Sequence, residues 1–278
     1  MKLRFRSPAF LAPQLVIAFL LTGVTTCALA ASSIVKEKAI SPASPQASVP
    51  GSPQTVTFAS GDETVSALIY LPRTKGPHPA IVVIHEWWGV TDWVKQQAQD
   101  FANHGYISLV VDLYRGKSSL DPMVAHELMR GLPQDRALRD MKGAVTYLQS
   151  LKDVRKDRIG AVGWCMGGSL ALQLALNDPS IRAVAINYGA PSTDKAQIAA
   201  MKADLLGNYG ALDRGITPED VHNFEATLKA TGHHPDIKIY ADAGHGFQNP
   251  INKDGYRPAD TQDAHQRMLD FFAKTLDT

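Results

Sequence analysis

Short runs rich in β-branched residues alternate with longer amphipathic stretches over most of the chain, and this alternation limits the possible folds more than any other feature. Strands separated by helices form a mainly parallel sheet, because each connection has to cross a face of that sheet. We therefore predict an α/β fold of the doubly wound kind, with helices on both faces. The predicted strands are Thr55–Phe58, Val65–Leu71, Ala80–Ile84, Ile107–Asp112, Arg158–Val162, Ala183–Asn187, Ala203–Leu206 and Ile237–Tyr240. The predicted helices are Trp93–Asn103, Pro122–Arg130, Asp135–Leu151, Met166–Leu176, Pro218–Ala230 and Ala259–Leu276.

Residues 1–30 have the features of an export signal. Three basic residues precede an apolar run at 15–21, and Ala28-Leu29-Ala30 supplies the small residues that signal peptidase accepts. The run is shorter than the ~20 residues of a membrane-spanning helix, so an anchor is the less favoured alternative. Cys27 offers lipid attachment as a further alternative, although Thr26 is bulkier than the residue usual before such a cysteine. We expect a periplasmic or secreted protein without stable membrane insertion once the signal is removed.

The remainder of the chain divides into a linker at 31–53 and one domain at 54–278. The linker is rich in Ser, Pro and Ala and has few large apolar residues, so it offers little surface to bury. In the whole chain 28 Lys and Arg residues balance 27 Asp and Glu residues, for a net charge of +1. No excess positive field is available to hold nucleic acid or an anionic membrane. We expect a small-molecule partner and leave the oligomeric state open, with a monomer favoured.

The clearest chemical motif lies between the predicted strand at 158–162 and the helix at 166–176. Its sequence, Gly163-Trp164-Cys165-Met166-Gly167-Gly168, has the small-x-nucleophile-x-small pattern of a nucleophile elbow, with Cys where Ser is more common. Glycines are expected there because a Cβ would clash in so tight a turn. Backbone N–H groups and the positive end of the helix favour a thiolate and can bind an oxyanion. We therefore interpret Cys165 as a nucleophile rather than as a buried structural cysteine.

An elbow enzyme of this kind needs an acid and then a histidine later in the chain. Asp213 follows the predicted strand at 203–206 and His245 follows the one at 237–240, so both would lie at the same sheet edge as Cys165. Asp242 is the alternative acid, but it lies only three residues before His245 and would have to fold back to orient that ring.

A zinc site is the other chemistry that the sequence suggests, and we reject it. His85-Glu86 begins like the H-E-x-x-H motif, but Gly89 occupies the place of the second histidine. The segment also ends a predicted strand, whereas the motif lies on a helix. We therefore predict no metal.

Several motifs together resemble the dienelactone hydrolase (carboxymethylenebutenolidase) family. They are the cysteine elbow, Asp213, and the segments His85-Glu86-Trp87-Trp88-Gly89, Asp112-Leu113-Tyr114 and Gly244-His245-Gly246-Phe247. The resemblance covers the chain from roughly Thr55 onward, and it implies an α/β-hydrolase fold, a Cys165-Asp213-His245 triad that opens an enol-lactone ring, and no cofactor. It also implies that Glu86 holds the thiol protonated at rest until substrate displaces it, and that the N–H groups of Trp87 and Met166 form the oxyanion hole.

The sequence departs from the family at the residues that would bind a substrate carboxylate. Family members acting on dienelactone hold that group with two arginines, whereas here Arg115 is displaced by one position from the first site and Asn249 stands at the second. We expect Arg115, Trp88 and Tyr114 to contact substrate, with weaker carboxylate binding and a broader apolar wall. Dienelactone is therefore not the natural substrate that we expect.

The favoured function is an exported hydrolase that cleaves a lactone or carboxylic ester through a thioester on Cys165. Two alternatives share the fold, because fold does not fix function. One is a binding protein without catalysis, and the other is an acyltransferase that uses the same thiol.

Overall fold

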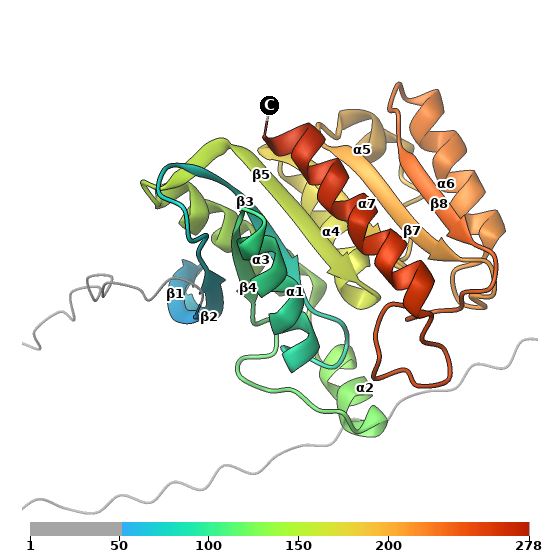
Figure 1. The fold of residues 1–278 in the computed structure, drawn as a ribbon, viewed down its shortest axis with the longest axis horizontal. Helices are drawn as coiled ribbons and strands as arrows, with labels where there is room; N and C mark the ends of the chain where they lie inside the picture. The colour runs from blue at the N-terminus through green and yellow to red at the C-terminus, as the bar shows by residue number, and fades with distance from the viewer. Residues whose placement is uncertain (1–51, 278) are drawn as a thin grey trace, which may run out of the picture. The chain divides into compact units, whose positions relative to one another are not determined.

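The computed structural model describes residues 52–277, which form an eight-stranded sheet with helices on both faces (Figure 1). The strands lie in the order β1-β2-β4-β3-β5-β6-β7-β8. β1 and β2 form an antiparallel hairpin at one edge, and the strands from β3 to β8 are parallel to one another. Their bounds are β1 Gln54–Ser60, β2 Glu63–Tyr70, β3 His78–Ile84, β4 Ile107–Val111, β5 Val154–Trp164, β6 Ile181–Asn187, β7 Asp204–Gly210 and β8 Asp236–Tyr240. The predicted α/β architecture is confirmed, while the predicted signal, Cys27 and nearly all of the linker lie outside the described residues.

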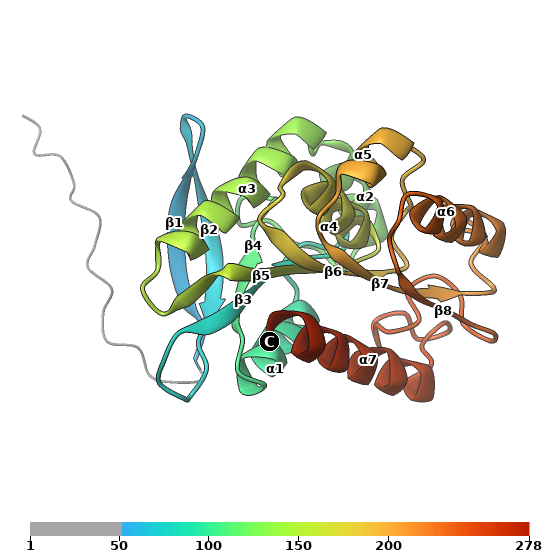
Figure 2. The ribbon, with the colours of Figure 1, turned by 90° about the horizontal axis from the view of Figure 1, so that it is seen from above.

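Helices cover the sheet in two layers (Figure 2). α1 and α7 lie on one face, and α3, α4, α5 and α6 lie on the other. The helices are α1 Asp92–Asn103, α2 Pro122–Arg130, α3 Gln134–Ser150, α4 Met166–Asn177, α5 Lys195–Ala200, α6 Pro218–Ala230 and α7 Pro258–Leu276. None of the described helices is long and apolar enough to span a bilayer.

The central strands bury both of their faces, which explains their nearly continuous apolar sequences. In β3, Val82 packs into the core on the α3 and α4 side, and its neighbours Ile81 and Val83 pack into the core on the α1 and α7 side. Successive side chains of a strand point to opposite faces, so one apolar run supplies both cores.

The start of a helix is well predicted where the sequence contains an N-terminal capping motif. Thr217 caps α6 in a capping box with Asp220, and Pro218 occupies the first turn. Two predictions were less accurate. Helix α5 is not predicted from the sequence, because its six residues are too few to show a helical period. The strand predicted at 203–206 also ends too early, since β7 continues to Gly210.

The parallel strands place their carboxyl ends at one edge of the sheet. In the register, Ile84 of β3 pairs with Gly163 of β5, and Trp164 pairs with Asn187 of β6. The loops that leave β3, β4, β5, β6, β7 and β8 therefore begin side by side at this edge, where ligands bind in open α/β sheets.

Candidate active site

Cys165 occupies a strained turn between β5 and α4. Its backbone has φ 56° and ψ −121°, and its N–H donates to the carbonyl of Asn187 at 3.0 Å. A Cβ on Gly163 would lie 2.0 Å from the carbonyl oxygen of Gly167, and one on Gly167 would lie 2.3 Å from that of Ile84. The expectation that these two glycines are required by close backbone approach is confirmed.

The structure brings the cysteine, the histidine and the aspartate together. His245 Nε2 lies 3.1 Å from the sulfur of Cys165, and His245 Nδ1 donates to Asp213 Oδ2 at 2.7 Å. Asp213 Oδ1 accepts the backbone N–H groups of Gly215 and Ile216 at 2.8 and 3.0 Å. The alternative acid Asp242 is exposed, so the carboxylate that orients the ring is Asp213.

Electrostatics keep this histidine protonated. Burial lowers the pKa of His245, but its contacts with Asp213 and Cys165 outweigh burial and raise that pKa to about 10. Burial raises the pKa of Asp213, but the bonds from His245 and the Ile216 N–H outweigh it, so the net shift is downward. An imidazolium between a carboxylate and a sulfur is the arrangement that stabilises a thiolate.

Two further sets of hydrogen bonds fix the loops that carry Asp213 and His245. The N–H groups of Ala211 and Leu212, which follow β7, donate at 2.9 Å to the carbonyls of Tyr240, the last residue of β8, and Ala243. In the second set, buried Gln248 accepts from Trp164 Nε1 at 3.0 Å and donates to Asn187 Oδ1 at 2.9 Å. The sequence analysis missed Gln248 and Asn187, although each is a polar residue that ends or closely follows a strand.

Glu86, directly after β3, is buried next to this constellation. Its carboxylate accepts hydrogen bonds from the Tyr188 hydroxyl at 3.2 Å and from the Asn249 amide. Burial outweighs these bonds and raises the pKa of Glu86 to about 7. The contact between Glu86 and the thiol that the family resemblance implies is not found among the described residues, where the sulfur contacts His245 instead. Tyr188 is a residue of this site that the sequence analysis missed.

The raised pKa of Glu86 predicts a pH-dependent stability difference for Glu86→Gln. A carboxyl group whose pKa rises from 4.5 to about 7 on folding favours the folded state below pH 4.5, and this contribution is lost as pH rises through 7. The shift corresponds to about 3 kcal/mol. Glutamine does not titrate, and it can still bond both partners by accepting from the Asn249 amide and donating to the Tyr188 hydroxyl. The variant should therefore gain stability relative to wild type by about 2–3 kcal/mol between roughly pH 5 and pH 8.

Denaturant unfolding of both proteins at the two pH values measures this difference. A stability difference that stays constant with pH would contradict the assignment of a buried, titrating Glu86. Asp242→Asn is a suitable control, since Asp242 is exposed.

The two N–H groups predicted to form the oxyanion hole lie on neighbouring strand ends. Trp87 follows Glu86 in the loop after β3, and Met166 is the first residue of α4. Within residues 52–277 neither N–H donates to a protein acceptor. Tyr114 lies in the same region, because its hydroxyl contacts Met166 Sδ at 3.4 Å. These positions suit a developing negative charge next to the sulfur, and the role itself stays a prediction.

Arg115 does not join the other predicted substrate residues. Its guanidinium binds Asp140 at 2.7 Å and Glu63 at 2.7 Å. The side chain of Asp140 is fully buried, so it needs a cation as partner. Asp112 accepts the N–H groups of Tyr114 and Gly116, and this tight turn holds Arg115 at φ 56°. The charge of Arg115 is therefore used in ion pairs within the protein, and its contact with substrate stays a prediction.

Trp88 is half-buried next to Trp87, with ring centroids 4.4 Å apart. Trp87 in turn lies 6.4 Å from the ring of His126 on α2. The aromatic pair therefore connects the end of β3 to α2, and contact of Trp88 with a substrate stays a prediction.

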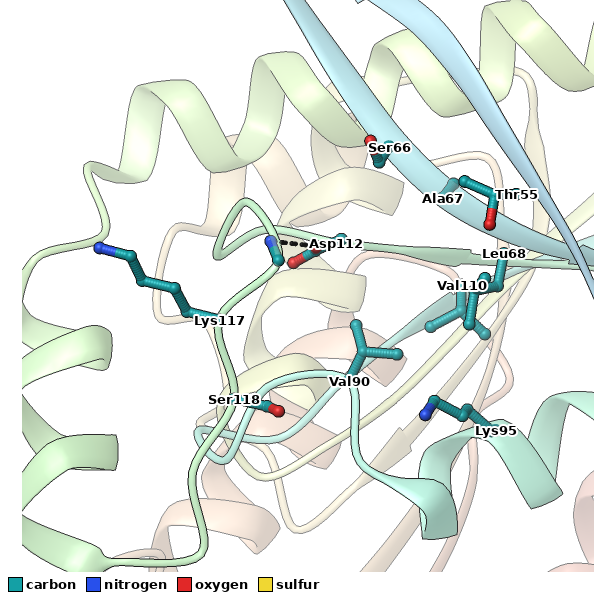
Figure 3. Close-up of a pocket in the computed structure, with 11 residues that line it drawn as sticks. Thr55, Ser66, Ala67, Leu68, Val90, Lys95, Val110, Asp112, Lys117 and Ser118 are labelled. Carbon is teal, nitrogen blue, oxygen red and sulfur yellow. Dashed lines mark hydrogen bonds between the residues drawn. The ribbon is translucent and has the colours of Figure 1, made fainter.

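A pocket of about 320 Å³ lies elsewhere, between the β2 and β4 strands and the loop at 116–118 (Figure 3). Val90, Lys95 and Asp112 are among its lining residues, whereas Cys165, Asp213 and His245 are not. It is not part of the candidate active site.

The strand order, the strained elbow and the strand-end order of cysteine, aspartate and histidine define an α/β-hydrolase. The family model described as "Dienelactone hydrolase family" matches residues 65–276. The chain belongs to this family, and it is a hydrolase of the dienelactone hydrolase type.

Known proteins similar to the chain include two sequence relatives and one solved structure. The "Putative carboxymethylenebutenolidase" of Methylorubrum extorquens is 27% identical over 76% of this chain and 77% of its own length. The "Probable 2-oxo-3-(5-oxofuran-2-ylidene)propanoate lactonase" of a Bradyrhizobium species is 30% identical over 77% of this chain and 91% of its own. The crystal structure of a dienelactone hydrolase-like promiscuous phosphotriesterase from metagenomic libraries has a TM-score of 0.74 at 19% identity, covering 81% of this chain and 98% of that one.

Proposed function

We propose that the protein hydrolyses a lactone or carboxylic ester through a thioester on Cys165. The observation that carries this proposal is the imidazole of His245, held 2.7 Å from a carboxylate on one side and 3.1 Å from the sulfur on the other. The names of the sequence relatives, a carboxymethylenebutenolidase and a lactonase, support the same bond type.

In the proposed mechanism the proton of Cys165 already lies on His245 Nε2 before the ester binds, and Asp213 stabilises the imidazolium. The thiolate attacks the carbonyl carbon, and the N–H groups of Trp87 and Met166 stabilise the oxyanion. The carbon–oxygen bond then breaks, and the leaving alkoxide takes the proton from His245. A water molecule gives a proton to His245 and attacks the thioester, which releases the carboxylic acid and restores the pair of thiolate and imidazolium.

The substrate that fits best is uncharged near the reacting carbonyl. Arg115 is bound to Asp140 and Glu63, and Asn249 is bound to Glu86, so neither is available to a substrate carboxylate. Large exposed apolar residues are Leu120, just before α2, Met123 and Val124 in its first turn, and Leu212, directly before Asp213. Burying an apolar substituent against such groups favours binding by about 25 cal/mol per Å².

Pairs of esters that differ only by a carboxylate test this function and its substrate class. We expect kcat/KM for the neutral ester to exceed that for its carboxylate analogue by at least about tenfold. The reason is that a carboxylate that enters the site without a partner loses its hydration and gains no charge-assisted hydrogen bond in return. Faster cleavage of the carboxylate analogue would contradict the neutral site. A binding protein would cleave neither ester, and an acyltransferase would pass the acyl group to an added alcohol in preference to water.

We also propose that the protein is exported. The basic start, the apolar run at 15–21 and Ala28-Leu29-Ala30 support cleavage after Ala30. The intact mass of the protein from the periplasm would separate this cleavage from lipid attachment at Cys27.

A further inference from the structure

Glu86 is a buried acid that the proposed chemistry does not use. The residue is only 3% exposed, and both of its hydrogen-bond partners, the Tyr188 hydroxyl and the Asn249 amide, are uncharged. The positive charge of His245 favours ionisation of the carboxyl group, but burial outweighs it, so the group is still expensive to ionise. A negative charge at this place would also oppose a second one on the Cys165 sulfur.

The Asn249 amide is oriented by the loop that carries His245. Its Oδ1 accepts the backbone N–H of Ile251 at 2.9 Å, and its own backbone N–H donates to the carbonyl of Gly246 at 3.2 Å. These bonds leave the amide nitrogen as the group that faces Glu86. The loop that supplies the general base therefore also fixes the position of the acid.

Tyr188 connects the same acid to the triad. It is fully buried with φ 40°, and its ring centroid lies 5.3 Å from that of His245. Burial raises the pKa of Tyr188, and the negative charges of Glu86 and Cys165 raise it further, so the hydroxyl stays protonated and can donate. The hydroxyl thus lies within electrostatic range of both the acid and the sulfur.

We propose that Asn249 is a positioning residue that, with Tyr188, keeps the Glu86 carboxyl group off the Cys165 sulfur, so that the thiol is paired with His245 before an ester binds. This inference rests on the proposed function, since it concerns the readiness of the same nucleophile. The contacts that hold Glu86 away from the sulfur all come from the protein itself. No anionic substrate group is then needed to displace Glu86, which agrees with a neutral substrate.

The reactivity of Cys165 toward iodoacetamide tests this role without relying on hydrolysis. Alkylation is measured near pH 6, where a free thiol with a pKa of ~8.5 is almost wholly protonated. We expect wild-type Cys165 to react well above the rate of such a thiol. Asn249→Leu removes the amide donor and frees Glu86 to bind the thiol, so alkylation should slow by about tenfold or more.

A double variant and a matched control separate this effect from general damage. Asn249→Leu combined with Glu86→Gln should recover alkylation to within about threefold of wild type, because no acid remains to hold the thiol. Gln248→Leu removes another buried amide from the same loop without touching Glu86, and it should slow alkylation less than Asn249→Leu does.

Two results would overturn the positioning role, namely alkylation of Asn249→Leu at the wild-type rate, or a loss that Glu86→Gln fails to reverse. Either result leaves the thioester mechanism standing if Cys165→Ala abolishes hydrolysis. Conversely, hydrolysis that survives Cys165→Ala would reject the proposed function whatever the alkylation rates show.

Discussion

Replacing Cys165 with alanine is expected to lower kcat for p-nitrophenyl acetate by at least about 10⁴-fold, because the variant has no atom that can form the acyl intermediate. The remaining rate would come only from binding and from the oxyanion donors. The substitution removes a sulfur from a half-buried position and leaves the turn intact, so the fold should survive.

Steady-state kinetics and thermal unfolding of the purified variant measure the two effects separately. We expect the free energy of unfolding to change by less than about 1–2 kcal/mol, within the usual range for a single truncation. A variant that folds and retains the wild-type rate would remove Cys165 from the mechanism.

Asp213→Asn is expected to reduce kcat by about 10⁴-fold while leaving KM nearly unchanged. The amide has nearly the shape of the carboxylate, but it cannot stabilise the imidazolium, and its NH₂ group can face the ring and select the wrong tautomer. The contact with Asp213 helps to raise the pKa of His245 to about 10. In the variant, the fall in activity at alkaline pH should therefore begin at a lower pH than in wild type.

The matched control for Asp213 is Asp242→Asn. Asp242 is exposed and lies close in sequence to His245, yet the hydrogen bond to the ring comes from Asp213. The Asp242 variant should keep kcat within a few-fold of wild type, since exposed substitutions have small effects. A larger loss at Asp242 than at Asp213 would contradict the assignment of the acid.

The local patterns in the sequence predict the fold and the order of the chemical groups well. Apolar runs identify the parallel strands because β3 and its neighbours are buried on both faces, and Gly163 and Gly167 identify the elbow because its turn admits no Cβ. Parallel strands also bring Asp213 and His245 to the same edge as Cys165, so their order alone predicts the constellation.

The parts that could not be predicted depend on partners far apart in the sequence. Arg115 looks available in sequence, but Asp140 of α3 and Glu63 of β2 bind it in the fold. In the sequence, Asn249 only marks the absence of the second family arginine. The structure shows that its amide donates to Glu86, which lies 163 positions away. A residue's own surroundings in the chain do not reveal which distant group will take its charge or its donor.

The most direct test is to follow the mass of the Cys165 peptide during the first turnovers with p-nitrophenyl acetate. An activated ester should acylate the enzyme faster than water removes the acyl group, so a burst of nitrophenol should accompany the gain of one acetyl group on that peptide. Sustained hydrolysis with no acetyl group on Cys165 at any time would contradict the thioester mechanism.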